Sequence, residues 1–489
     1  MSTQAQTTAA EALTADAFSN LMGKAVRATT PEKQTAVSRS VSTLCEFALR
    51  DARLVSGDAL KTINALIAEI DRKLSEQINL ILHQDEFREL EGTWRGLHYL
   101  VNNTETDEML KIKVFNVSKT DLRKSLGKFE GTAWDQSPLF KKIYEEQYGT
   151  RGGKPFGALI GGYNFDHTAP DVKLLAGVAQ IAAASFAPFF AAAAPSLFGM
   201  ESWRELNNPR DLTKIFAPAE YAAWNSFRKT DDARYIGLTL PRFLARMPYG
   251  AKKSPVDAFA FEEDTGNGDH SKYVWSNAAF ALGTKITQSF KEYGWTARIR
   301  GRESGGTVNK LPVDTFPTGD GGTDMKCPTE VAIPDRREAE LAKNGLIALC
   351  HEKGNDFAVF ESAQSVQEPT KYESDEATAN ARLSAAFPYL MSTCRFAHYL
   401  KVMVRDKVGS FKERADMEEW LNKWISQFTC DSKASEEMKA RYPLASAEVK
   451  VEEVPGAPGY YTSRFYLRPH FQLEGLTVSL RLVSKMPAK

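Results

Sequence analysis

The stretch "RGGKPFGALIGGYNFDH", residues 151–167, decides between two kinds of fold. Its five glycines and single lysine are typical of a loop around a nucleotide phosphate, whereas its apolar centre is typical of a buried strand. A phosphate-binding loop needs the pattern G-x-x-x-x-G-K-[ST], because the hydroxyl holds Mg²⁺ and the backbone amides surround the phosphates. Here Gly153 and Lys154 are followed by Pro155, which offers neither group. The part "PFGALIGGY" therefore predicts a buried strand whose glycines allow close packing or a turn.

The segments around this strand predict an α/β core. The stretch "LLAGVAQIAAASFAPFFAAAAPSLF", residues 174–198, has the length of a membrane span, but its alanines contribute little to insertion and two prolines interrupt it. We therefore expect a helix of small residues packed against a sheet. Apolar patterns predict strands at 111–119 and 235–243 and a helix at 274–290. Strands and helices thus alternate along the chain, which is typical of an α/β fold.

The same alternation continues after about residue 330. Residues 335–345 predict a helix with Asp335 as its N-cap, and residues 346–362 predict two strands joined by a turn. Long helices are expected at 376–407 and 411–428. The chain ends in a β-rich segment without an obvious complete sheet of its own.

The composition excludes several classes of partner. The 489 residues suggest about two to four domains, and 62 basic side chains balance 62 acidic ones. Without a basic surplus, neither nucleic acid nor a membrane is an expected partner, whereas zero net charge weakly favours association between copies. The five cysteines are scattered without a CxxC pair, which argues against structural zinc and indicates a reducing compartment. The N-terminus lacks the pattern of a signal peptide, so we expect a cytoplasmic protein.

No motif for catalysis or metal binding has the required spacing. The stretch "HEKGN" begins at His351, but Asn355 stands where an HExxH zinc motif needs its second histidine, and no G-x-S-x-G elbow occurs. Asp166, His167 and Asp171 could belong to a metal shell, although such spacing is common by chance. We therefore predict no catalytic, cofactor-binding or metal site. One alternative stays open, an α/β enzyme with its site near Asp166 and Asp171 at the carboxyl end of a strand.

Two amphipathic helices are predicted near the N-terminus. Ile63, Ile67, Ile70 and Leu74 follow one another at steps of four, three and four residues, so they form one apolar stripe. A second stripe lies at residues 87–101. Either helix could face the protein core, which is the commoner case, or bind a partner helix.

The helix predicted at 411–428 is also amphipathic. Its large apolar residues share one face, and Lys412, Asp416, Glu419 and Lys423 share the other. The pairs Lys412–Asp416 and Glu419–Lys423 are four residues apart and can form ion pairs. The charged face is therefore either a solvated, self-paired surface or a docking face for a partner.

Several long stretches resemble one protein family. They are "DDARYIGLTLPRFLARMPYG" (231–250), residues 298–345, residues 394–422 and residues 460–485, together with "DEFRELEGTWRGLHYLV" (85–101). These stretches are similar to the large subunit of the type VI secretion contractile sheath, in the VipB/TssC-like EvpB family. The resemblance covers nearly all of residues 50–489.

The resemblance implies a mixed α/β structural protein that is not an enzyme. It implies an inner domain similar to phage tail sheaths, into which residues 61–330 are inserted as a large outer α/β domain. The inner domain would consist of residues 331–489, with C-terminal strands exchanged between subunits. Residues 1–60 would contribute an arm and a linker to it.

The resemblance also implies the partners. The chain would form a heterodimer with a small sheath subunit, and these pairs would polymerise as a six-start helix around an inner tube protein and above a baseplate. Contraction in the bacterial cytoplasm would then deliver effectors into a target cell, and no cofactor is implied. We expect the stripe of Ile63, Ile67, Ile70 and Leu74 to bind the small subunit. By the same resemblance, Lys412, Asp416, Glu419 and Lys423 face the inner tube.

Overall fold

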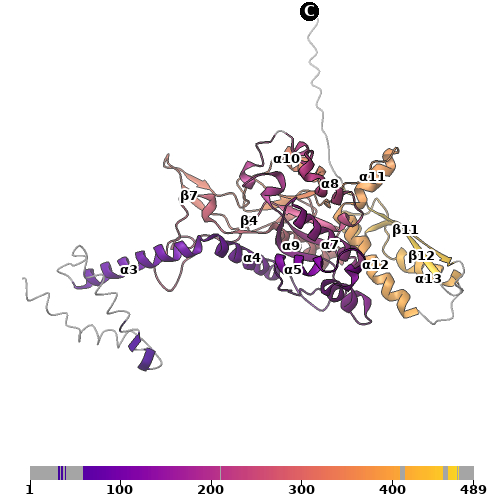
Figure 1. Ribbon diagram of the computed structural model, residues 1–489, viewed down its shortest axis with the longest axis horizontal. Helices are drawn as coiled ribbons and strands as arrows, with labels where there is room; N and C mark the ends of the chain where they lie inside the picture. Colours follow the sequence, from indigo (N-terminus) through magenta and orange to yellow (C-terminus); the bar gives the residue numbers. More distant parts are fainter. Residues whose placement is uncertain are drawn as a thin grey trace, which may run out of the picture. The chain divides into compact units, whose positions relative to one another are not determined.

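The computed structural model describes residues 31–33, 35–36, 39, 59–209, 211–407, 414–454, 461–470 and 472 (Figure 1). Its contacts divide the chain into two compact units. The first unit contains Met1–Arg88, Met247–Tyr273 and Phe316–Thr323, and the second contains Glu89–Arg246, Val274–Thr315 and Asp324–Lys489. None of the described helices is long and apolar enough to cross a membrane.

A six-stranded mixed sheet forms the centre of the second unit. Its order is β1-β2-β3-β9-β10-β6, with the first four strands parallel and the last two antiparallel to their neighbours. The strands are β1 (Leu159–Phe165), β2 (Phe189–Ala193), β3 (Ile236–Leu240), β9 (Leu346–His351), β10 (Ala358–Phe360) and β6 (Thr307–Val308). This sheet confirms the mixed α/β class, and β1 is the strand predicted from the glycine-rich stretch.

Helices cover both faces of this sheet, because successive strand residues point to opposite sides. In β9, Leu346 and Ala348 pack in one core with α7 (Ala169–Ser185), whereas Ile347 and Leu349 pack in a second core. The helices of the second core are α9 (Ala278–Tyr293) and α12 (Phe387–Lys407). The sheet therefore lies between two apolar layers.

Three expectations about this region are corrected. The helix expected at 174–198 ends at Ser185, because Phe186 adopts a left-handed conformation (φ 52°) and a proline precedes the buried strand β2. The strand expected at 111–119 is not formed, because residues 110–118 have no regular secondary structure and no described strand pairs with them. The single helix expected at 376–407 is two, α11 (Asp375–Ser384) and α12.

The sheet also bears on the expected domain boundary at 330. Strands β1 to β3 precede that residue and strands β9 and β10 follow it, so the boundary would divide one hydrogen-bonded sheet. Helix α10 (Asp335–Lys343) leads into β9, with Pro334 and not Asp335 in the N-cap position. Asp335 is the first helical residue instead.

The C-terminal part has a small core of its own. Helix α13 (Arg414–Ser426) and the antiparallel pair β11 (Leu444–Glu453) and β12 (Tyr461–Pro469) enclose it. The core contains the buried residues Trp295, Phe396, Leu400, Leu421, Ile425, Leu444, Val449 and Val451. Side chains of β12 alternate between half-buried and exposed, as the sequence pattern predicts for a strand with one covered face.

Apart from short 3₁₀-helices, the remaining elements are short or lie before and between these parts. They are α3 (Ala59–Leu82), α4 (Asp85–Asn102), α5 (Lys119–Gly127), α6 (Pro138–Phe140), a π-helix (Lys141–Gly149), α8 (Ala222–Arg228), β4 (Phe243–Leu244), β5 (Trp275–Ser276), β7 (Thr315–Pro317), β8 (Thr323–Met325) and α14 (Glu436–Arg441).

Candidate interaction surfaces

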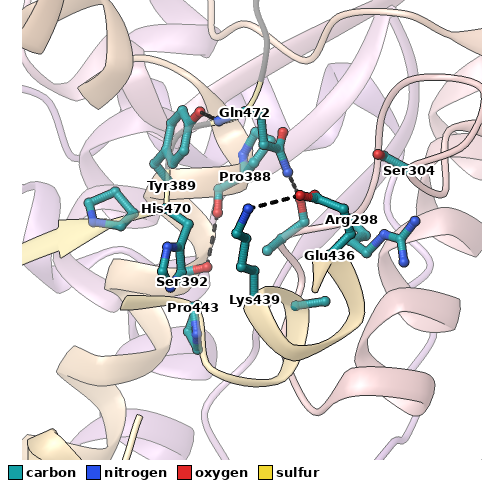
Figure 2. A pocket seen from close by; sticks show the side chains of 13 residues that line it. Arg298, Ser304, Pro388, Tyr389, Ser392, Glu436, Lys439, Pro443, His470 and Gln472 are labelled. Carbon is teal, nitrogen blue, oxygen red and sulfur yellow. Dashed lines mark hydrogen bonds and ion pairs between the residues drawn. The ribbon is translucent and has the colours of Figure 1, made fainter. Parts of the chain in front are cut away.

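A small cavity of about 40 Å³ lies between α12, α14 and the end of β12 (Figure 2). Its volume suits a few water molecules and not a nucleotide or another cofactor. Gln472 lies at its border, where its Nε2 donates to the carbonyl of Ala297 (2.8 Å) and its Oε1 accepts from Nε of Arg300 (2.9 Å). Its backbone N–H donates to the hydroxyl of Tyr389 (2.9 Å). The polar groups here therefore hold Gln472 in place.

The carboxylates near the end of β1 have structural partners. Asp171 Oδ2 accepts from Nζ of Lys119 (2.6 Å) and from the backbone N–H of Asp166 (3.0 Å). Asp166 Oδ1 accepts from the backbone N–H (2.8 Å) and the hydroxyl (2.5 Å) of Thr168. Burial alone would raise the pKa of Asp166, but the bonds from Thr168 outweigh it and lower that pKa. These contacts fix the turn into α7. Asp166 and Asp171 therefore have a structural role at the place where the alternative hypothesis puts an enzyme site.

No metal site is formed by the described residues. Among them, no group of three or more His, Cys, Asp or Glu side chains could hold a metal ion.

Helix α3 presents the predicted apolar stripe to solvent. Ile67 is 51 % exposed and Leu74 is 45 % exposed, whereas Ile70 is half-buried. The side chain of Ile63 lies outside the described residues. On the opposite side of the helix, Arg72 pairs with glutamates one turn before and one turn after it. The helix is thus amphipathic with its apolar side open.

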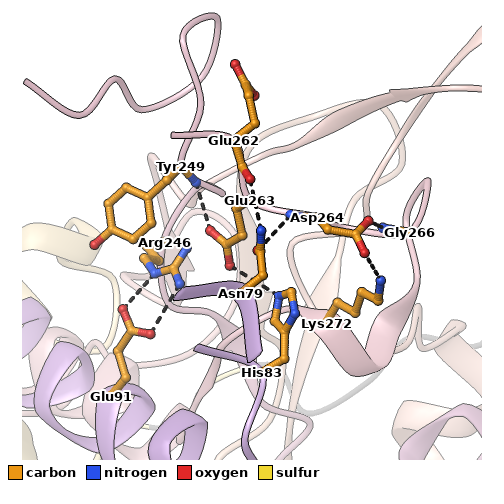
Figure 3. Close-up of polar contacts among 10 residues, drawn as sticks. All are labelled: Asn79, His83, Glu91, Arg246, Tyr249, Glu262, Glu263, Asp264, Gly266 and Lys272. Carbon is orange, nitrogen blue, oxygen red and sulfur yellow. Dashed lines mark hydrogen bonds and ion pairs between the residues drawn. The ribbon is translucent and has the colours of Figure 1, made fainter. Parts of the chain in front are cut away.

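The C-terminal end of α3 is attached to residues 247–273 of its own unit (Figure 3). Asn79 Nδ2 donates to the carbonyl of Glu262 (3.1 Å), and its Oδ1 accepts from the backbone N–H of Asp264 (2.9 Å). His83 Nε2 lies 3.8 Å from Oε1 of the buried Glu263, and burial lowers the pKa of His83. This end of the helix is anchored, so the open stripe lies on a fixed support.

Helix α4 separates a close-packed face from an open one. A Cβ atom on Gly92 would lie 2.3 Å from the carbonyl oxygen of Trp275, and one on Gly96 would lie 2.4 Å from the ring of Phe280. Glycine is therefore required where α4 approaches β5 and α9. On the outer face, Trp94 is 61 % exposed, and Leu90 and Val101 are also exposed. Exposed apolar side chains gathered on one helix face are typical of a protein interface.

Helix α13 carries the predicted charged face. Asp416, Glu419 and Lys423 are exposed together, while the large apolar residues of the helix pack in the C-terminal core. Lys412 lies outside the described residues. The structure thus brings three of the four predicted residues to one surface.

Two residues of α13 that sequence reasoning did not single out bind β11. Asn422 Nδ2 donates to the carbonyl of Val449 (2.8 Å), and its Oδ1 accepts from the Val449 N–H (2.8 Å). Glu418 Oε2 accepts from the N–H of Val451 (2.9 Å). The only sequence signal was an acid and an amide one turn apart on the flank of an amphipathic helix.

Comparison with known proteins identifies the family. Residues 64–367 match the VipB family described as EvpB/VC_A0108, tail sheath N-terminal domain, and residues 376–486 match its tail sheath gpW/gp25-like domain. The type VI secretion system sheath protein TssC1 of Pseudomonas aeruginosa is 60 % identical over 473 residues, which are 96 % of this chain and 95 % of that protein.

Two solved structures are also similar. A chain of the anti-feeding prophage baseplate is 11 % identical, with a TM-score of 0.39. The match covers 80 % of this chain and 87 % of the baseplate chain. A chain of the contracted PVC sheath complex, an extracellular contractile injection system, is 9 % identical with a TM-score of 0.33, covering 63 % and 68 %. From the family matches and the identity to TssC1, the chain belongs to the VipB (EvpB/VC_A0108) family of type VI secretion sheath proteins, which are structural subunits and not enzymes.

Proposed function

We propose that this sheath subunit pairs with a small sheath subunit and that the pairs polymerise as a six-start helix around an inner tube. The sheath would extend from a baseplate in the bacterial cytoplasm, and its contraction would drive the tube and its effectors into a target cell. The observation that carries the proposal is the 60 % identity to the sheath protein TssC1 along 96 % of the chain.

The open stripe of α3 supports a contact with the small subunit. Ile67 and Leu74 expose apolar surface on a helix whose C-terminal end is anchored. Burying such side chains against a partner helix removes apolar area from water, which is the main favourable term in association. We infer that Ile63, Ile67, Ile70 and Leu74 form the edge of this interface.

The exposed face of α13 supports a contact with the inner tube. Asp416, Glu419 and Lys423 lie on the side of the helix away from its core, and Lys412 precedes them in the sequence. A contact that must release during contraction is better made by exposed charges than by apolar residues, because exposed ion pairs contribute only about 0–1 kcal/mol each.

We infer that the chain is organised as an inner sheath domain with a large inserted outer domain. The boundaries implied by the family resemblance, residues 1–60, 61–330 and 331–489, need one change. The inclusion of β9 and β10 in the six-stranded sheet supports moving the second boundary into residues 367–376, where the two family matches meet. The inner domain would then begin near α11.

Electron microscopy tests the assembly directly. The chain is co-expressed with its small partner subunit, and long tubes are the expected particles. Discrete particles of fixed mass would contradict polymerisation and would favour the alternative of an α/β enzyme. A hollow tube with the two chains in equal amounts would support the heterodimer as the repeating unit.

A further inference from the structure

Residues 111–116 form a run of backbone without helix, turn or bend, and they pair with no strand in the described part of the chain. The sequence alternates like a strand here, yet within the described chain none of these six residues makes a backbone–backbone hydrogen bond. Free N–H and C=O groups on extended backbone are what allow another chain to add as a β-strand. The segment therefore has the sequence of a strand and the hydrogen-bonding capacity of an open edge.

Both ends of this segment are fixed. Before it, Asp107 accepts from the backbone N–H of Met109 through Oδ1 (2.7 Å) and from Nζ of Lys291 through Oδ2 (2.6 Å). After it, the hydroxyl of Tyr163 donates to the carbonyl of Val117 (2.7 Å). Because the two ends are held, a partner strand would have little backbone to order on binding, which favours affinity.

The same segment exposes apolar side chains. Val114 is 63 % exposed and Phe115 is 55 % exposed, and Met109 at its start is exposed further still. Val114 and Phe115 are adjacent, so in an extended chain they point to opposite faces. Apolar surface is thus available on both faces of any strand pair formed here.

Four lysines lie in or beside the segment, with Asp107 as an acidic neighbour of Lys111 and Gln147 bonded to Nζ of Lys113 (3.1 Å). Lys111 and Lys113 are two residues apart and share one face with Phe115, whose ring lies 6.0 Å from Nζ of Lys142. Lys154 approaches Lys111 closely, and this contact lowers the pKa of Lys111. Cations held together in this way repel one another, and an anionic partner would relieve the repulsion.

We propose that residues 111–116 receive an extended acidic segment of a partner polypeptide, which adds as a β-strand. Main-chain hydrogen bonds would supply the pairing, and carboxylates at alternate positions of the incoming strand would face Lys111 and Lys113, with Lys142 and Lys154 beside them. The inference rests on the proposed function in one respect: the partner segment is expected to belong to the assembled sheath.

Hydrogen–deuterium exchange of the full chain tests the pairing. The amides of residues 111–116 should exchange freely in the chain alone and be protected at least about tenfold in assembled tubes. Tubes in which these amides exchange as fast as in the free chain would overturn the proposal while leaving the proposed sheath function intact. Protection already present in the free chain would also overturn it, since the occupant would then belong to this chain itself.

Charge reversal tests the chemistry of the partner. Lys111→Glu with Lys113→Glu should reduce protection of residues 111–116 and the yield of tubes several-fold, without changing the thermal midpoint of the free chain. The matched control is Lys128→Glu with Lys214→Glu, which reverses two exposed lysines elsewhere. Equal protection in both double variants would overturn the requirement for an acidic partner.

A proline tests the backbone contribution separately. Val114→Pro removes one free N–H in the middle of the segment and should abolish protection of its neighbours in tubes. The control is Gly319→Pro, at the second position of an exposed turn closed by the bond from Gly321 N–H to the Thr318 carbonyl (3.1 Å), where proline is favoured. If Val114→Pro tubes keep the protection of wild type, no strand is added at this segment.

Discussion

Asn422 of α13 forms hydrogen bonds with both backbone groups of Val449 in β11. Its side chain donates to the Val449 carbonyl and accepts from the Val449 N–H, at 2.8 Å each. In an antiparallel pair, a residue whose N–H and C=O point away from the neighbouring strand lies in a non-hydrogen-bonded position. Val449 and its partner Phe465 in β12 therefore form such a pair, and the outer edge of β11 is closed by a side chain. Within the described chain, β12 pairs with no strand other than β11, so its outer edge is open to another strand.

The first prediction concerns this closure. Asn422→Ala leaves the N–H and C=O of the buried Val449 without partners, and each unsatisfied group costs about 1–3 kcal/mol. We expect the free energy of unfolding to fall by about 2–4 kcal/mol, measured by denaturant titration of the heterodimer. The control Glu419→Ala, on the exposed face of the same helix, should change it by less than about 0.5 kcal/mol. Equal effects of the two substitutions would contradict the assigned role.

The second prediction concerns the stripe of α3. Leu74→Asp places a charge in the apolar surface proposed to meet the small subunit, and burying it there without a partner is costly. Co-purification with the small subunit should fall at least tenfold. Ala68→Asp introduces the same charge on the same helix, about 120° from the centre of the stripe, and should leave co-purification unchanged. Retained binding by Leu74→Asp would count against this interface.

The third prediction concerns the charged face of α13. Reversing Lys412 and Lys423 together should leave the thermal midpoint unchanged, because Lys423 is exposed and exposed charges contribute little to stability. Co-sedimentation with the inner tube should decrease, more so at low salt, where charge contacts are less screened. Lys433→Glu, an exposed lysine outside this helix, serves as the control. Unchanged co-sedimentation of the double variant would contradict the tube contact.

Sequence reasoning was accurate where the pattern of one segment decided the structure. The apolar centre of residues 151–167 predicted a strand, and that strand is β1. It also placed Asp416, Glu419 and Lys423 on one exposed side of α13, because helical periodicity alone fixes which residues share a face.

It was inaccurate where the outcome depended on a distant partner. Residues 111–119 alternate like a strand, but strand formation needs a neighbouring backbone, and none is described here. Asn422 was not singled out, since its hydrogen bonds to β11 depend on tertiary packing that the helix sequence does not indicate. The expected boundary at residue 330 took no account of the sheet for the same reason, because β3 pairs with β9 across more than a hundred residues.

The fourth prediction concerns acid stability. His398 is buried in α12, its Nε2 lies 2.8 Å from the carbonyl oxygen of Ser185, and burial lowers its pKa to about 4. The unfolded chain, with a histidine pKa near 6.5, binds the proton first, so stability is lost as pH falls from about 6.5 to about 4. This group should contribute a loss of about 2–3 kcal/mol over that window.

The variant His398→Gln isolates this effect, because its amide can still donate but does not titrate in that range. Thermal unfolding between pH 4 and pH 7.5 should show a smaller decrease for the variant than for wild type. His98→Gln, at an exposed histidine, should keep the wild-type profile. Parallel profiles for wild type and His398→Gln would mean that other groups determine the acid sensitivity.

The last prediction follows from the closed edge of β11. An isolated two-stranded sheet is marginal in water, and β12 pairs only with β11 among the described strands. Since Phe465 lies in a non-hydrogen-bonded pair, its N–H and that of Ser463, two residues before, point away from β11. We propose that this edge accepts a strand from a neighbouring subunit, supplied by the N-terminal arm, which lies outside the described residues.

Deleting residues 2–25 should then leave a soluble heterodimer that does not grow into tubes, and Ser463→Pro should do the same by removing one outward N–H. Arg464→Pro is the informative contrast, because the N–H of Arg464 points toward β11, so its loss should destabilise the subunit itself. Normal tubes from the truncated chain would exclude the arm as the linking strand. If Ser463→Pro forms tubes while the truncated chain does not, the arm is still the linking strand, but it docks at a site other than β12. A shared sheet at this edge would keep subunits joined through backbone bonds while their outer domains rotate during contraction, because those bonds do not depend on how side chains repack.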